Sequence, residues 1–139
     1  MKINDERKKR YEEKIELGLS RIDIIEETIN EFENEKLKLA SYKAFQEVVE
    51  CVTDVIAMIL IDKDKVVEDD YTNTEKIKEI VIFKDEEIKI IKEANGLRNR
   101  IIHKYNRTDD SIAKESIINL IPKLEIILNK FKINIKDEK

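Results

Sequence analysis

The scarcity of glycine and proline is the feature that most limits how this chain can fold. Its 139 residues include only 2 glycines and 1 proline, and these are the residues that interrupt helices and form tight turns. Charged residues make up 42% of the chain and hydrophobic residues 41%. A strand-rich fold would need more turn residues, whereas this mixture suits long amphipathic helices. The sequence therefore predicts an all-α protein.

Apolar residues recur at helical spacing through the first half of the chain. One heptad stripe predicts a helix over about residues 4–33, and a second predicts a helix over about 35–62. The second helix also has a partly apolar further face, typical of a central helix or of one that meets another subunit. The first helix carries Tyr11, Ile15, Gly18, Ile22, Ile25, Ile29 and Phe32; the second carries Phe45, Val48, Val52, Val55 and Ile59.

The second half of the chain predicts a loop and then three more helices. Residues 63–73 are polar and are expected to form the loop, after which Thr74 is expected to cap a short helix. Asp85 is expected to cap a fourth helix that ends near Tyr105.

A turn over residues 106–109 should lead into a last helix over about 110–131, kinked at Pro122 because proline removes a backbone donor. The predicted architecture is a single domain over residues 1–139, an up-and-down bundle of four long helices plus a short one.

Composition also bears on location and chemistry. The charged N-terminus is not followed by an apolar stretch, and the longest apolar run, Val55 to Ile61, is far below the roughly 20 residues needed to span a bilayer. Cys51 is the only cysteine, so no disulfide forms within one chain. These features predict a cytoplasmic protein without a membrane segment.

Net charge is −4, which is not typical of a nucleic-acid-binding protein. The segment from Lys89 to Arg107 is nevertheless basic, with six cations against Glu93 alone. This segment is either a solvated helix face or a local anion-binding surface.

Several classes of active site are argued against by missing motifs. The chain has one histidine and one cysteine. It contains no H-E-x-x-H motif, no paired C-x-x-C, no Gly-rich phosphate loop and no nucleophile elbow. We therefore expect no metal ion and no cofactor.

The fourth predicted helix places polar residues where apolar ones are expected. Its apolar arc covers roughly 140° of the helical wheel; Arg98 and Tyr105 fall inside it, while Asn99 and His103 sit together at its edge. A guanidinium on such a face must be paired or must face a polar cleft. Spacing alone does not decide between two interpretations. One is a structural arginine together with a core tyrosine, and the other is a functional site.

The residues themselves resemble a known motif. Gly96-Leu97-Arg98-Asn99-Arg100-Ile101-Ile102-His103-Lys104-Tyr105 is similar to R-x4-H-x-Y of the HepT-like branch of the HEPN superfamily, in which Asn usually follows the Arg. Residues 41–47 with Asp54 resemble the family's second helix, so the resemblance spans about residues 13–131. Asn106 stands where many relatives have Gly, but Asn tolerates left-handed backbone angles.

The resemblance implies a metal-independent endoribonuclease toxin that works as a homodimer, with both motifs lining one cleft. It also implies a nucleotidyltransferase antitoxin, MntA, which neutralises the toxin by adding AMP to Tyr105. Attached AMP would oppose RNA by charge and by bulk.

The chemistry of the residues is consistent with this activity. In metal-free cleavage the 2′-hydroxyl attacks phosphorus, a base accepts its proton and an acid protonates the leaving 5′-oxygen; His103 suits either task. Because each chain has one histidine, a two-histidine mechanism needs both subunits. Arg98 would stabilise the growing phosphate charge. Asn99 would orient His103 or bind phosphate, or alternatively make a helix–helix hydrogen bond.

Other polar residues are weaker candidates. Arg100, Lys104 and Arg107 would contact RNA or the antitoxin, although each alone also fits a solvated surface role. Glu47 and Asp54 are candidates to pair with Arg98 across the dimer interface.

Two other functions remain open on the sequence. One is a non-catalytic binding module of the same family, which partners a nucleotidyltransferase or serves as its substrate. The other is a purely structural helical dimer in which the motif is accidental.

Overall fold

The computed structural model describes residues 3–81, 83–103 and 109–136. This part of the chain forms five α-helices and one 3-10 turn and contains no strand, which confirms the all-α prediction. The elements are α1 (Asp5–Thr28), η1 (Ile29–Glu31), α2 (Glu35–Asp62), α3 (Asp70–Ile77), α4 (Asp85–His103) and α5 (Asp110–Lys136).

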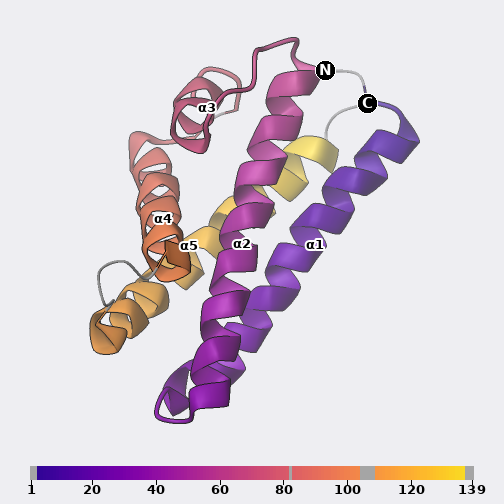
Figure 1. Ribbon diagram of the computed structural model, residues 1–139. Coiled ribbons are helices and arrows are strands. Elements are labelled where there is room, and N and C mark those ends of the chain that lie inside the picture. Colours follow the sequence, from indigo (N-terminus) through magenta and orange to yellow (C-terminus); the bar gives the residue numbers. More distant parts are fainter. Residues whose placement is uncertain (1–2, 82, 104–108, 137–139) are drawn as a thin grey trace.

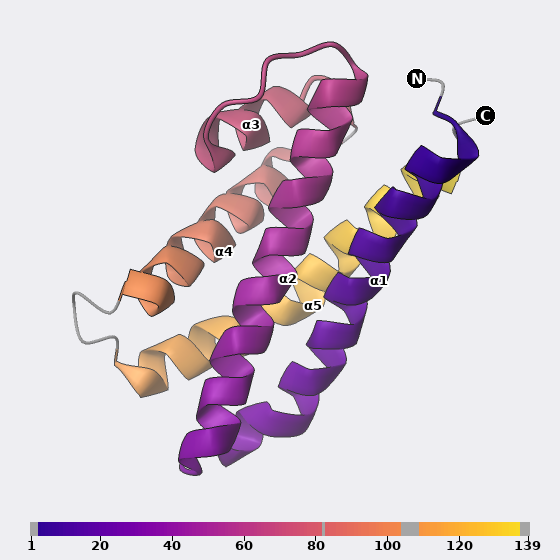
Figure 2. The same cartoon turned by 45° about the vertical axis from the view of Figure 1, so that its right-hand side comes forward.

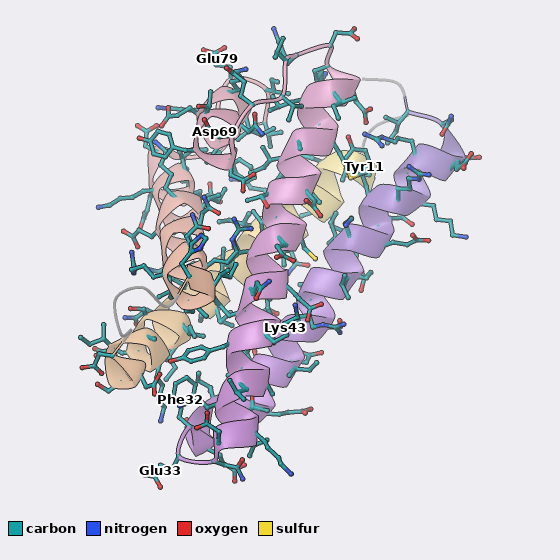
Figure 3. The ribbon with its side chains drawn as sticks, in the orientation of Figure 1. Tyr11, Phe32, Glu33, Lys43, Asp69 and Glu79 are labelled. Atoms are coloured by element: carbon teal, nitrogen blue, oxygen red, sulfur yellow. The ribbon has the colours of Figure 1, made fainter. Side chains whose placement is uncertain are left out.

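Helices α1 and α2 form an antiparallel hairpin that runs the length of the molecule (Figure 1). Each begins at an asparagine cap: the Asn4 side chain accepts a hydrogen bond from the Arg7 amide, and Asn34 accepts from the amides of Lys36 and Leu37. The side chain of Tyr11 lies between the two helices and donates to Asp62, near the end of the hairpin where α1 begins and α2 ends (Figure 3). A polar contact between the two helices thus fixes this end of the hairpin.

Helix α5 packs against α1, α2 and α4, and α3 packs against α2 and α4 (Figures 1 and 2). One continuous core joins all five helices. Its fully buried large side chains are Tyr11, Phe45, Phe131, Ile15, Ile22, Ile25, Ile56, Leu60, Ile77, Ile91, Ile117 and Leu124.

Gly18 marks a place where three helices come close together. A Cβ added there would lie 3.0 Å from Leu128 Cδ1 of α5 and 3.3 Å from the Cβ of Cys51 of α2. A residue without a side chain therefore lets α1 approach both neighbours. Burial raises the pKa of the Cys51 thiol to about 11, so this buried cysteine stays protonated near neutral pH.

The short third helix begins earlier than predicted. Residues 70–73 were expected in a loop, but α3 begins at Asp70 because Asp69 is extended and its side chain accepts from the Thr72 amide. Thr74 is not the cap; it is buried within α3, and its hydroxyl donates to the Asp70 carbonyl.

Smaller corrections concern the ends of the other helices. The first helix tightens into η1 after Thr28, so it does not continue to residue 33 as an α-helix. Asp85 is the first residue of α4 and not its cap, and the Lys84 amide donates to Glu87 instead. Helix α5 continues through Pro122 and extends to Lys136, beyond the predicted end at 131, because Ile135 is buried against the core.

Polar contacts join α5 to α4 near one end of α5 and to α2 near the other. Glu87 in the first turn of α4 accepts from Lys130 of α5 at 2.7 Å. At the opposite end Asp110 begins α5 and accepts from Tyr42 and from Lys38, the latter at 3.1 Å. The Tyr42 hydroxyl, followed by the Lys38 ammonium, lowers the pKa of Asp110 although partial burial opposes this. The start of α5 is thus fixed to α2, and Figure 2 shows it on the same side of the molecule as the C-terminal end of α4.

In the stretches that the structure describes, no helix is both long enough and apolar enough to cross a membrane.

Candidate functional site

The motif residues of α4 divide between the core and the surface. Leu97 and Ile101 are buried, whereas Asn99, Arg100 and His103 are exposed. Arg98 lies between these groups, with a side chain that is 14% exposed. The helix therefore presents a polar edge next to its apolar face, as the wheel predicted.

Arg98 is held by two oxygen atoms that lie on different helices. Its Nη2 donates to Asp70 Oδ2 of α3 at 3.3 Å and to the side-chain oxygen of Asn99 at 3.1 Å. The Asp70 side chain is 37% exposed, so this ion pair lies at the surface between α3 and α4, not in the core. Figure 3 labels Asp69, the residue that precedes Asp70 and caps α3.

Two buried polar atoms on this face of α4 have no hydrogen-bond partner among the described residues. They are Arg98 Nε and Asn95 Oδ1, which lie three residues apart and so share one side of the helix. Unpartnered buried polar atoms are rare in folded proteins and cost free energy. Both atoms are covered by the chain's own residues, so this side of α4 carries a desolvation cost that no described hydrogen bond offsets.

Asn99 connects the arginine to the side of α4 that carries His103. It lies one turn before His103, about 40° away around the helix, and both are exposed. Its side-chain oxygen draws Nη2 of Arg98 toward that side. His103 is the last described residue of α4.

Some predicted site residues lie outside the described residues. These are Lys104, Tyr105 and Arg107, together with the expected turn from 106 to 108. The chain is described again from Asp109, whose carboxylate caps α5 by accepting from the Ser111 hydroxyl and from the amides of Ser111 and Ile112. The Ser111 hydroxyl and these amides lower the pKa of Asp109.

Glu47 and Asp54, the predicted partners of Arg98, bind cations of α1 within the chain. Glu47 pairs with Arg21 at 3.3 Å and Asp54 with Lys14 at 2.9 Å. The carboxylate that does meet Arg98 within the chain is Asp70, which the sequence reasoning missed. Pairing of Glu47 or Asp54 with Arg98 of a second subunit stays a prediction.

A groove of about 650 Å³ lies on another side of α4, between α4 and α5. It is lined by Lys92, Glu93, Gly96, Leu97 and Arg100 of α4 and by Ser116, Asn119, Leu120 and Lys123 of α5. Three of these side chains are cationic and one is anionic. Arg100 is thus the one predicted RNA-contact residue that the described part of the chain places in a concave surface.

The described residues contain no group of three or more His, Cys, Asp or Glu side chains positioned to hold a metal ion. The metal independence expected from the sequence stays a prediction.

A match to a known family agrees with this geometry. The family model described as "Ribonuclease HepT-like" matches residues 15–131, which include α2 to α4 in full and most of α1 and α5. The chain belongs to the HepT-like ribonuclease family. The resemblance predicted from the motif is confirmed, with almost the same bounds.

Curated relatives of this HepT-like chain carry consistent names. Two Archaeoglobus fulgidus proteins, each named "Putative RNase", are 34% identical over 126 residues and 33% identical over 134 residues. These matches cover 91% and 94% of this chain and 94% of each relative. A Methanocaldococcus jannaschii protein, also named as a "Putative RNase", is 46% identical over 48% of this chain and 76% of its own length.

Proposed function

We propose that this HepT-like protein is a metal-independent endoribonuclease toxin that cleaves RNA with Arg98 and His103 at a cleft between two subunits. The observation that carries the proposal is the Arg98–Asn99 contact on α4. It directs a guanidinium toward the helix side on which His103 is exposed, in a chain of a ribonuclease family.

The proposed reaction uses the 2′-hydroxyl of the substrate as the nucleophile. A base removes its proton as the oxygen attacks the adjacent phosphorus, the bond to the 5′-oxygen breaks, and an acid protonates that oxygen. The products are a 2′,3′-cyclic phosphate and a free 5′-hydroxyl, so no water enters this step. Arg98 stabilises the charge that accumulates on the phosphoryl oxygens.

Two subunits are needed if both proton transfers use histidine. Each chain has one histidine, so the base and the acid are His103 of one subunit and the same residue of its twofold partner. Arg98 and His103 lie about 140° apart around α4 and about 7.5 Å apart along it, so the Asn99 contact is what brings the Arg98 guanidinium toward the His103 side.

Purified protein incubated with RNA and a chelator tests this activity. Cleavage should proceed without added metal, and expression in cells should stop growth. A protein that leaves RNA intact but binds a nucleotidyltransferase would instead be the non-catalytic binding module.

Asp70 should act as a positioning residue for Arg98 in this reaction. Asp70→Asn removes the charge that holds Nη2 from α3, so we expect kcat to fall about tenfold with little change in KM. Asp69→Asn is the matched control, because it changes the adjacent aspartate at a cap position where Asn serves equally well.

A double-mutant cycle separates positioning from a general effect on folding. In an Arg98→Lys background, Asp70→Asn should lower kcat by a much smaller factor than in the wild type, because the partner of Asp70 is already altered. An equal loss of kcat in both backgrounds would show that Asp70 does not act through Arg98.

Regulation is proposed to act on Tyr105, just beyond the described end of α4. A nucleotidyltransferase antitoxin would transfer AMP from ATP to the phenolic oxygen and release pyrophosphate, adding negative charge two residues after His103 along the chain. Intact-mass measurement after incubation with such an enzyme and ATP should show added AMP that disappears in Tyr105→Phe. An AMP increment that persists in this variant would exclude Tyr105 as the sole acceptor.

A further inference from the structure

The groove between α4 and α5 differs in character from the Arg98 face. Its walls combine Arg100 of α4 with Lys123 of α5, both exposed, and its polar lining includes Ser116 and Asn119. Glu93 is the one carboxylate among the lining residues. This combination of separated cations and neutral hydrogen-bonding groups suits an anion with several oxygen atoms.

The cations of the groove point in different directions. Lys92 faces α3, where it pairs with Glu75 and its ammonium lies 4.3 Å from the centroid of the Tyr71 ring. Arg100 of α4 and Lys123 of α5 line the same concave surface from two different helices. A ligand between the two helices would therefore meet Arg100 and Lys123 together.

Gly96 opens the floor of the groove. A Cβ added at this position would meet only Arg100 Nη1, at 3.6 Å, within 4 Å. The guanidinium thus lies over a residue that has no side chain to displace a ligand. A larger residue at position 96 would occupy the groove without changing its charge.

His103 lies beyond the groove-lining residues of α4, on the same side of the helix as Gly96. Gly96 and His103 are seven residues apart and lie within about 20° of each other around the helix. Arg100 precedes His103 by three residues, about 4.5 Å along the axis. A single extended strand can therefore reach both residues.

We propose that the α4–α5 groove binds the phosphate backbone of the RNA strand next to the phosphate that is cleaved, with Arg100 and Lys123 as its phosphate contacts. This inference rests on the proposed ribonuclease function. It adds α5 to a substrate surface otherwise built from α4. The groove should then favour longer substrates. A substrate with one phosphate places that phosphate at the cleavage site and has no second phosphate for the groove.

Binding is measured apart from cleavage with a fluorescein-labelled 2′-O-methyl oligouridylate, which lacks the attacking hydroxyl. In fluorescence anisotropy, the double variant Arg100→Gln/Lys123→Gln should bind about tenfold more weakly. The slope of log affinity against log salt should fall by about 0.7 for each phosphate of the single strand that the variant no longer neutralises. Lys9→Gln, which removes an exposed cation of α1, should change neither quantity.

Gly96→Leu provides a variant that keeps the charges. Leucine favours a helix more than glycine does, so the fold should be retained, while its side chain fills the groove. We expect weaker binding with an unchanged salt slope. Wild-type affinity in this variant would contradict occupation of the groove.

Substrate length supplies the second comparison. The double variant should lose kcat/KM on an oligoribonucleotide but keep the wild-type value on a dinucleoside monophosphate. An equal loss on both substrates, or an unchanged affinity and salt slope for the oligonucleotide, would overturn the groove proposal. So would unchanged RNA binding combined with weakened binding of an acidic protein partner.

These outcomes separate the groove from the ribonuclease activity itself. A wild-type protein that binds the 2′-O-methyl strand through Arg100 and Lys123 but cuts no RNA would refute the ribonuclease function alone. A protein that cuts RNA normally in both variants would refute the groove alone.

Discussion

Replacing His103 by alanine should reduce RNA cleavage by roughly 10²- to 10⁴-fold, the usual contribution of an acid–base group. Arg98→Ala should reduce it by roughly 10²- to 10³-fold, as for loss of one group that stabilises transition-state charge. Both losses should appear in kcat, measured with a fluorescent RNA in the presence of chelator. Growth arrest on expression should disappear in parallel.

The fold should survive these two changes. His103 is exposed at the end of α4, and Arg98 pairs with a carboxylate that lies at the surface, so thermal unfolding and helical content should change little. Arg21→Ala is a suitable control, because Arg21 is also partly buried and paired with a carboxylate but lies on α1. Cleavage by His103→Ala within a few-fold of wild type would refute the proposed proton transfers.

Adding inactive His103→Ala subunits to wild-type protein should suppress the activity of the wild-type chains. If one cleft needs both histidines, every mixed dimer is inactive. After subunit exchange with a threefold excess of the variant, only about a quarter of wild-type chains keep a wild-type partner. Activity per wild-type chain should fall to the same fraction, whereas an equal excess of Lys9→Gln should not lower it.

Exchange itself must be verified in this experiment, for example by native mass spectrometry of differently tagged subunits. Unchanged activity per wild-type chain despite abundant mixed dimers would show that one chain contains a complete site. A monomer with full activity would lead to the same conclusion.

Helix-forming regions were largely predictable because their apolar residues repeat at helical spacing. The stripe through Ile15 and Ile22 faces the core as predicted, and so does the one through Val48 and Val52. Such periodicity depends on one helix at a time. It therefore needs no knowledge of which helices become neighbours.

Helix ends and contacts between helices were harder to predict. Asp69 and Thr74 are both acceptable caps in sequence, and the choice of Asp69 depends on the packing of α3 against α2 and α4. The same packing brings Asp70 to Arg98, two residues that are 28 positions apart. The groove likewise depends on the pairing of α4 with α5. Of its two proposed phosphate contacts, only Arg100 of α4 could be anticipated from the basic character of the segment around the motif.

Cleavage of an RNA oligonucleotide with a single 2′-deoxynucleotide at the cut position, in the presence of a chelator, tests the central claim most directly. The all-ribose strand should be cut and should leave a 2′,3′-cyclic phosphate, since the 2′-hydroxyl is the nucleophile. The deoxy substitution should abolish that cut alone. Cleavage that persists at the deoxy position, or that requires an added metal ion, would contradict the proposed mechanism.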